Sequence, residues 1–195
     1  MPNLPILDSL VQNLFKHAEK VGLPVIFDMQ DRIGGIFGLY DEPGLPGLEH
    51  TLQKFPDLII IGHGPAFWAE IGKLRTPADR SSLLLPDWNC IGGKPEYPVE
   101  EEGVVPYLFR RYKNLYGDLS SECGWNALAR DIDYAISFLN EFQDRLLFGT
   151  DICGPDTPLP LPDFLLNLLE KGKISEDVFN KIARENAIKL FNLQD

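Results

Sequence analysis

The sequence lacks any long apolar run. One of its most apolar stretches, Leu58-Ile-Ile-Ile61, is four residues long, whereas a helix needs about 20 apolar residues to cross a membrane. The first residues, Met-Pro-Asn-Leu-Pro, do not combine a charged region with an apolar one, as a targeting peptide does. We therefore expect a cytoplasmic protein that is neither exported nor bound to a membrane.

Basic residues are also scarce. The chain has 18 Lys and Arg residues against 29 Asp and Glu residues, and its formal net charge is -11. Proteins that bind nucleic acids draw most of their affinity from cationic side chains that contact phosphates. The charge balance therefore excludes a nucleic-acid partner and leaves a small-molecule substrate as the expected ligand.

Cysteine is rare and widely spaced. The three residues are Cys90, Cys123 and Cys153, so the chain has neither an even set of cysteines nor a CxxC zinc or redox motif. This usage fits a reducing compartment. Cys153 follows Asp151 by two residues, and we interpret it as a small packing residue that could face the same edge of the fold.

The chain contains enough apolar residues for a sizeable core. With 195 residues and 44% hydrophobic content, one domain over residues 1–195 is expected. Strand-like and helix-like patterns alternate along it. The predicted strands are 24–29, 58–61, 114–120 and 146–148. A helix is predicted before the first strand, over 6–21, and further helices between the strands, over 48–55, 65–74, 100–113 and 126–142. Such alternation predicts an α/β fold with a parallel sheet and right-handed crossovers.

Glycine and proline mark the connections. Residues 30–47 read as a loop, and residues 76–98 as a long irregular loop of the kind that often forms a functional lid. Trp88 in that loop could close over a ligand. After the last strand we expect helices over 163–170 and 186–191 and a helix capped by Ser175.

Polar residues stand at or near the end of each predicted strand. They are Asp28, His63, Asp118 with Ser120, and Asp151. The carboxyl ends of parallel strands meet at one rim, so these side chains should converge there. Imidazole and carboxylate groups bind zinc, iron or manganese, and a bound ion of this type lowers the pKa of its water to about 7. The pattern indicates metal-assisted hydrolysis.

Each of these residues also has a structural interpretation. His63 between two glycines could bond the backbone of a turn, and Asp151 could cap the segment that follows it. Asp28 could pair with Arg32 or Lys94. The two remaining histidines, His17 and His50, lie on predicted helices and are interpreted as surface or half-buried residues. Asp118 could be a structural hydrogen-bond acceptor.

Four segments together resemble the amidohydrolase-related family. They are Gly22-Leu-Pro-Val-Ile-Phe-Asp-Met29, Leu52-Gln-Lys-Phe-Pro-Asp-Leu-Ile-Ile-Ile-Gly-His63, Tyr116-Gly-Asp-Leu-Ser120 with Arg145-Leu-Leu-Phe-Gly-Thr-Asp151, and Glu185-Asn-Ala-Ile-Lys-Leu-Phe191. This family consists of metal-dependent (β/α)8-barrel enzymes that include hydrolases and non-oxidative decarboxylases. The segments occur in the family's order and span nearly the whole chain.

The resemblance implies roles for three residues. His63 matches the histidine after the sixth barrel strand, and Asp151 matches the carboxylate after the eighth, which binds metal or acts as the general base. Asp28 stands where the family usually has a histidine ligand on the fifth strand, so we expect it to be a replacement ligand. The implied ion is zinc, with manganese or iron as alternatives. The family's HxH pair on the first strand has no counterpart, so this chain could also lack the metal.

By the same resemblance, the chain corresponds to the C-terminal half of a (β/α)8 TIM barrel. Such a barrel closes with eight strands and about 250 residues, whereas four strands are predicted here. A half-sheet would leave two unpaired edges and an apolar inner face in water. We therefore expect a homo-oligomer, or association with a missing N-terminal half.

Three functions follow as hypotheses. The first is an amidohydrolase-like metal enzyme that acts on a small molecule, with His63, Asp151 and Asp28 at the metal and Asp151 as the catalytic base. The second is a non-catalytic partial barrel without a complete metal site. The third is a small-molecule binding module with residues 76–98 as its lid. A substrate carboxylate could be held by any of four cations that the sequence does not rank: Arg32, Lys94, Arg110 and Arg111.

Overall fold

A computed structural model describes residues 4–32, 38–84 and 90–193 of the chain. The role considered for Trp88 falls outside these residues. The part of the predicted lid that is described contains a 3-10 turn, Pro77–Arg80, and an antiparallel hairpin of β5 (Ser82–Leu84) and β6 (Cys90–Gly92). The hairpin shows that the segment is more regular than its glycines and prolines suggest.

The centre of the fold is a parallel sheet of six strands in the order β1-β3-β2-β4-β7-β8. Its strands are β1 (Leu4–Pro5), β2 (Val25–Gln30), β3 (Leu39–Tyr40), β4 (Ile60–His63), β7 (Leu115–Asp118) and β8 (Leu146–Leu147). The four predicted strands are confirmed as β2, β4, β7 and β8. β1 and β3 were not predicted, because their two residues do not lie in an apolar run, whereas those of β8 belong to the run Leu146 to Phe148.

Helices connect the strands and continue to the end of the described chain. Their bounds are α1 (Ser9–Val21), α2 (Pro46–Lys54), α3 (Pro65–Ala69), α4 (Val104–Arg111), α5 (Ser121–Ala129), α6 (Ile132–Phe142), α7 (Pro160–Glu170), α8 (Glu176–Asn180) and α9 (Asn186–Phe191). Ser175 caps α8 as predicted, because its hydroxyl accepts the N–H of Val178. No helix in the described ranges is long and apolar enough to cross a membrane.

The helix predicted over 126–142 is wrong as a single element. The structure has two helices, α5 and α6, and the second begins after Asp131. The carboxylate of Asp131 accepts the backbone N–H of Tyr134 at 3.0 Å, which is the contact of a helix N-cap. The apolar spacing continues through the break, so the pattern alone did not reveal it.

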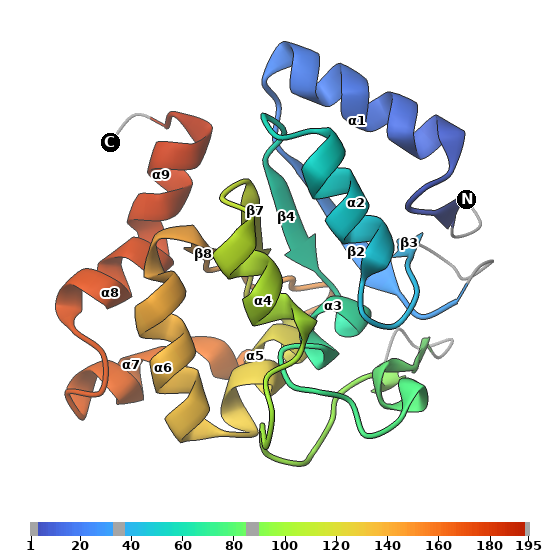
Figure 1. Cartoon of the computed structure of the whole chain (residues 1–195). Helices are drawn as coiled ribbons and strands as arrows, with labels where there is room; N and C mark the ends of the chain where they lie inside the picture. The colour runs from blue at the N-terminus through green and yellow to red at the C-terminus, as the bar shows by residue number, and fades with distance from the viewer. Residues whose placement is uncertain (1–3, 33–37, 85–89, 194–195) are drawn as a thin grey trace.

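Helices cover one face of the sheet, and shorter elements lie at its carboxyl end. Figure 1 shows α1, α2, α4 and α6 arranged around the sheet, with α3 and α5 beyond the tips of β2 and β4. The core between the layers is aromatic: the rings of Phe15 and Phe27 are 5.6 Å apart, and that of Phe138 lies 5.9 Å from Phe109. Such ring pairs add to the stabilisation from burial.

The two sides of the half-sheet differ. At β8 the outer edge is closed, because the N–H of Phe148 donates to the carbonyl of Ile182 and the Asn186 amide donates to that of Leu146. At β2 no described strand pairs with the outer side of residues 25–27. The side chain of Ile26 points from a face of the sheet, and its exposure of 57% shows that this face is uncovered there. The expectation of two unpaired edges is therefore wrong for the β8 side, where the C-terminal helices supply the missing bonds.

Candidate functional site

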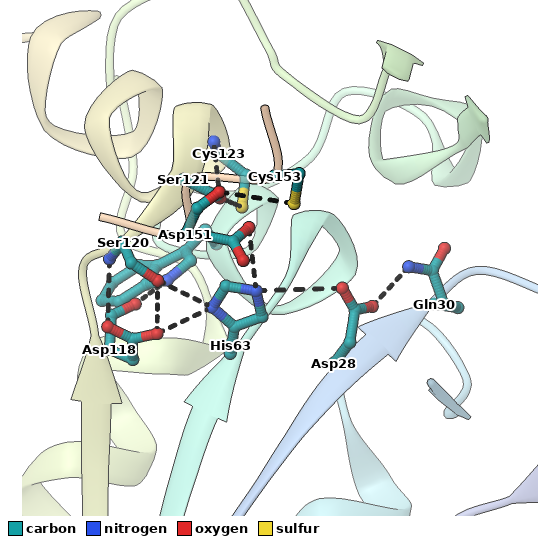
Figure 2. A network of polar contacts seen from close by, with 10 residues as sticks. Asp28, Gln30, His63, Asp118, Ser120, Ser121, Cys123, Asp151 and Cys153 are labelled. Atoms are coloured by element: carbon teal, nitrogen blue, oxygen red, sulfur yellow. Dashed lines mark hydrogen bonds and ion pairs between the residues drawn. The ribbon is translucent and has the colours of Figure 1, made fainter. Parts of the chain in front are cut away.

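The strands bring the predicted rim residues together. Asp28 on β2 and His63 on β4 are partners in the parallel register, and β7 lies on the other side of β4, with Asp118 at its end. Parallel strands align their carboxyl ends, so side chains at those ends reach the same space. Figure 2 shows His63 between Asp118 and Ser120 on one side and Asp28 and Asp151 on the other.

The imidazole of His63 is held through one of its nitrogens. Its Nδ1 lies 2.9 Å from Asp118 Oδ2 and 3.4 Å from Ser120 Oγ. Since a carboxylate can only accept, Nδ1 carries the hydrogen and donates it to Asp118. The other nitrogen, Nε2, is left to face the rim.

Asp118 is itself fixed in place. The backbone N–H of Ser120 donates to Asp118 Oδ1 at 3.1 Å, and the indole N–H of Trp68 donates to the Asp118 carbonyl at 2.7 Å. Asp118 is therefore the hydrogen-bond acceptor considered from the sequence, and its contact with His63 sets the orientation of the ring.

Two carboxylates face the free nitrogen. Asp28 Oδ2 lies 3.9 Å and Asp151 Oδ2 lies 4.0 Å from His63 Nε2. Both distances exceed those of a direct hydrogen bond. Asp28, His63 and Asp151, which the sequence predicts as a set, thus converge on one point from three different segments.

The pKa values reflect this crowding of charges. Burial raises the pKa of Asp28 to about 6, against the lowering effects of His63 and Gln30, and Asp151 raises it further. Burial lowers the pKa of His63, but the hydrogen bond to Asp118 and the nearby carboxylates outweigh it and leave the pKa raised. For Asp118 burial raises the pKa, yet the bonds from His63 and Ser120 prevail and lower it. The His63–Asp118 pair therefore favours its charged form.

Asp151 occupies an unusual backbone conformation. Its φ is +53°, in the left-handed region that non-glycine residues rarely adopt, and Ser121 after β7 has φ +65°. Such conformations cost about 1–3 kcal/mol and cluster at functional sites. The carboxylate of Asp151 is 45% exposed, so it can be reached from solvent while it faces His63.

Several structural alternatives can now be assessed. Among the described residues, the ion pair of Asp28 is with His63, whereas Arg32 pairs with Asp31 and Lys94 with Glu122. The suggestion that Arg32 or Lys94 neutralises Asp28 is therefore wrong. Of the other cations considered for a substrate, Arg110 pairs with Glu102 and Glu141, and Arg111 lies 3.8 Å from Glu49.

The expected roles of the remaining histidines and cysteines are partly correct. His17 and His50 are exposed helix residues, as predicted. Cys153 is exposed, so it is not the packing residue that we expected, and its sulfur lies 3.5 Å from the Asp151 carbonyl. Cys123 is the buried cysteine, and burial raises the pKa of its thiol to about 12, so it stays protonated.

Gln30 is a site residue that the sequence prediction missed. Its side-chain amide donates to Asp28 Oδ1. The prediction placed Gln30 in the loop 30–47, which is wrong at this residue because β2 extends to Gln30. Residues two apart on a strand point to the same face, so a strand extended by one residue would have placed Gln30 beside Asp28.

Parallel β/α units with polar side chains gathered at the carboxyl rim define a TIM-barrel type of α/β protein. The amidohydrolase family matches residues 4–193, so the chain belongs to the amidohydrolase family. Members of this family are generally enzymes that use a divalent metal ion. No curated protein matches the chain.

Similar solved structures share the fold. An uncharacterised TIM-barrel protein of Bordetella bronchiseptica has a TM-score of 0.56 and 23% identity, covering 96% of this chain and 52% of that one. A 2,6-dihydroxybenzoate decarboxylase from Rhizobium (TM-score 0.46, 17% identity, 96% and 57% covered) and an amidohydrolase described as putative from Staphylococcus aureus (0.46, 16%, 97% and 61%) are more distant. The chain spans about half to three fifths of the length of these structures, and it corresponds to part of a barrel.

The chemical types of the donor atoms around His63 Nε2 suit a divalent ion. An imidazole nitrogen and carboxylate oxygens bind zinc, iron and manganese, and a carboxylate on the opposite nitrogen is the usual support of a metal-binding histidine. They do not form a complete site: within the described ranges, no group of three or more His, Cys, Asp or Glu side chains is arranged to hold a metal ion. The described residues thus bring together donors of suitable types without forming a site for a metal ion.

Proposed function

We propose that the chain provides one half of the active site of a metal-dependent hydrolase or non-oxidative decarboxylase that acts on a small molecule. In this proposal His63, Asp28 and Asp151 are donors to a divalent ion, for which we favour zinc, with manganese or iron as alternatives. The observation that carries the proposal is the orientation of His63, whose Nδ1 is bonded to Asp118 at 2.9 Å while Nε2 faces two carboxylates.

Each residue has a distinct part in this chemistry. Asp118 accepts the Nδ1 hydrogen of His63, so that Nε2 is the nitrogen that loses its proton when the ring is neutral and then directs its lone pair at the rim. Asp151 is exposed and close to Nε2, so it is placed to take a proton from water or substrate as a general base. A divalent ion, when bound, supplies Lewis acidity and lowers the pKa of water to about 7.

Metal content tests the proposal directly. After reconstitution with zinc or manganese and removal of excess ion, we expect mass spectrometry to find stoichiometric metal in the wild-type protein. The substitution His63→Ala should abolish it, whereas His17→Ala, which removes an exposed histidine from α1, should not. Absence of stoichiometric zinc and manganese from the wild type would contradict the proposal.

The chain is further proposed to work in association, either with a second copy or with the half of the barrel that it does not contain. α1 buries Val11, Phe15 and Ala18, but its other side exposes Leu10 (71%) and Leu14 (62%). These leucines lie on the helix whose Phe15 packs on Phe27 of β2. Leu10 and Leu14 are one helical turn apart on the same side of α1, and exposed apolar side chains that gather in this way are typical of interaction sites.

A non-catalytic partial barrel is the alternative function. It is favoured by one observation, that no described group of three potential ligands is arranged to hold an ion. The substitution Asp28→His separates the two proposals, since it restores the histidine that the family resemblance implies on this strand. Metal binding that appears only in this variant would support the non-catalytic alternative.

A further inference from the structure

We infer that Gln30 is a positioning residue for Asp28, which it holds so that Oδ2 is presented to His63. The role of this carboxylate as a ligand rests on the proposed function, but its fixed orientation does not. The residues around Asp28 therefore orient a carboxylate, at a position where the family resemblance implies a histidine.

The first part of this arrangement is a hydrogen bond. Gln30 Nε2 donates to Asp28 Oδ1, while Asp28 Oδ2 is the oxygen that lies 3.9 Å from His63 Nε2. Figure 2 shows Gln30 and His63 on opposite sides of the Asp28 carboxylate. The bond thus fixes one oxygen and leaves the other directed at the rim.

Gln30 is itself held at the end of β2. Its backbone pairs with Tyr40 of β3, and its carbonyl accepts a hydrogen bond from the guanidinium of the buried Arg80 at 3.4 Å. The strand fixes Asp28 and Gln30 on one face. The amide is neutral, so it orients the carboxylate without cancelling the negative charge that faces His63.

Two glycines complete the enclosure of Asp28. A Cβ on Gly64, which has φ +95°, would lie 2.8 Å from Asp28 Oδ1 and 2.9 Å from its Cγ. A Cβ on Gly38, at φ +89°, would lie 2.8 Å from Gln30 Cγ and 3.0 Å from Asp28 Oδ1. The backbone therefore approaches Oδ1 as closely as only glycine allows, and the carboxylate has little room to turn on that side.

Partners that orient a metal ligand typically change metal affinity by about 10–100-fold when they are removed. The test compares Gln30→Leu with the wild type by calorimetric titration with Zn²⁺ and with Mn²⁺. We expect the variant to bind about 10–100-fold more weakly. The matched control is Gln12→Leu, which also removes a side-chain amide but one that bonds the Ile6 carbonyl and Thr51; it should lower stability and leave metal affinity unchanged.

A crystal structure of Gln30→Leu supplies a readout that does not depend on metal. We expect the Asp28 carboxylate to rotate away from its wild-type orientation. Unchanged metal affinity in a wild-type-like fold would overturn the inference, and so would an unchanged carboxylate. If the wild type binds neither ion, the proposed function fails, and the orientation of Asp28 alone then decides the inference.

Discussion

His63 shows most clearly how single residues make this site. Its pKa is raised above the ordinary value of 6.5 and that of Asp118 is lowered below 3.8. A raised histidine pKa stabilises the fold below pH 6.5, and this contribution is lost as the pH rises through the folded value. A lowered aspartate pKa stabilises the fold above pH 3.8, and this is lost as the pH falls. The pair therefore contributes most between these two pH values.

Removing the Asp118 carboxylate tests its effect on the pKa of His63. In Asp118→Asn the His63 ring loses its ion pair while burial continues to disfavour its charged form, so its pKa should fall. The change can be followed by NMR titration of the His63 ring. Asp57→Asn, at an exposed site, is the matched control and should leave the His63 titration unchanged. An equal His63 pKa in Asp118→Asn and wild type would contradict the assigned contact.

Asp28 should make the fold less stable when it is ionised. Its pKa is raised from 3.8 to about 6, so the free energy of unfolding falls as the pH rises through this range. Without metal, Asp28→Asn should be more stable than the wild type by about 1–3 kcal/mol at pH 7.5, and nearly equal to it at pH 3.5. Urea unfolding in the presence of a chelator at both pH values measures this. If the stability difference between Asp28→Asn and the wild type is the same at both pH values, ionisation of Asp28 is not its cause.

The rim residues could be predicted from the sequence, but their partners could not. Asp28, His63 and Asp151 each lie at or near the end of a recognisable strand, and parallel strands must align their ends. The bond between Gln30 and Asp28 depends on side-chain rotamers, and that between His63 and Asp118 on the orientation of the ring. No spacing in the sequence encodes these orientations.

At the scale of elements, buried charges tie the loops to the sheet. Arg80, which is 1% exposed, pairs with Glu70 and donates to the carbonyls of Glu42 and Asp41. The other oxygen of Glu70 accepts the N–H of Gly44 at 2.7 Å. This ion pair thus joins the 3-10 turn Pro77–Arg80, which precedes β5, to the loop that precedes α2.

Breaking this ion pair should be costly. Arg80→Met leaves the Glu70 charge buried without its partner, and the expected loss of stability is about 3–5 kcal/mol. Adding Glu70→Gln should recover part of that loss, because the uncompensated charge is removed. Denaturant unfolding of the single and double variants measures both effects. A double variant less stable than Arg80→Met would contradict this explanation.

The strand predictions succeeded where the chain has a continuous apolar run. The apolar runs of β2, β4, β7 and β8 were recognised, and Arg145 before β8 proved to be a structural link, since it donates to the carbonyls of Phe109 and Tyr112 at 2.7 and 2.8 Å. The short pairing of β1 with β3 is a long-range contact. It arises from the tertiary fold and leaves no local pattern.

The molecule as a whole is an incomplete barrel with two different sides. The sequence predicted the four principal strands. Association stays a prediction, which is argued from the inner face that half a barrel cannot enclose. The sequence did not predict that Asn186 would close the β8 edge through a side-chain amide. Among the described strands, the outer side of β1 and that of residues 25–27 of β2 have no strand partner.

Association should depend on the exposed side of α1. The wild type should show a mass above the 22.0 kDa of one chain in light scattering at increasing concentration, and Leu10→Lys with Leu14→Lys should shift it toward one chain. Leu166→Lys on α7 replaces another exposed leucine and is the control. A wild type that stays at the mass of one chain throughout would contradict self-association, leaving the other half of the barrel as the partner.

The central claim is that His63 Nε2 and the carboxylates of Asp28 and Asp151 bind one divalent ion. Anomalous diffraction from crystals soaked with zinc or manganese tests it most directly. The account predicts a single peak between these side chains, about 2.0–2.2 Å from His63 Nε2. A peak elsewhere, or no peak beside His63 in a soaked crystal with an intact rim, would contradict it.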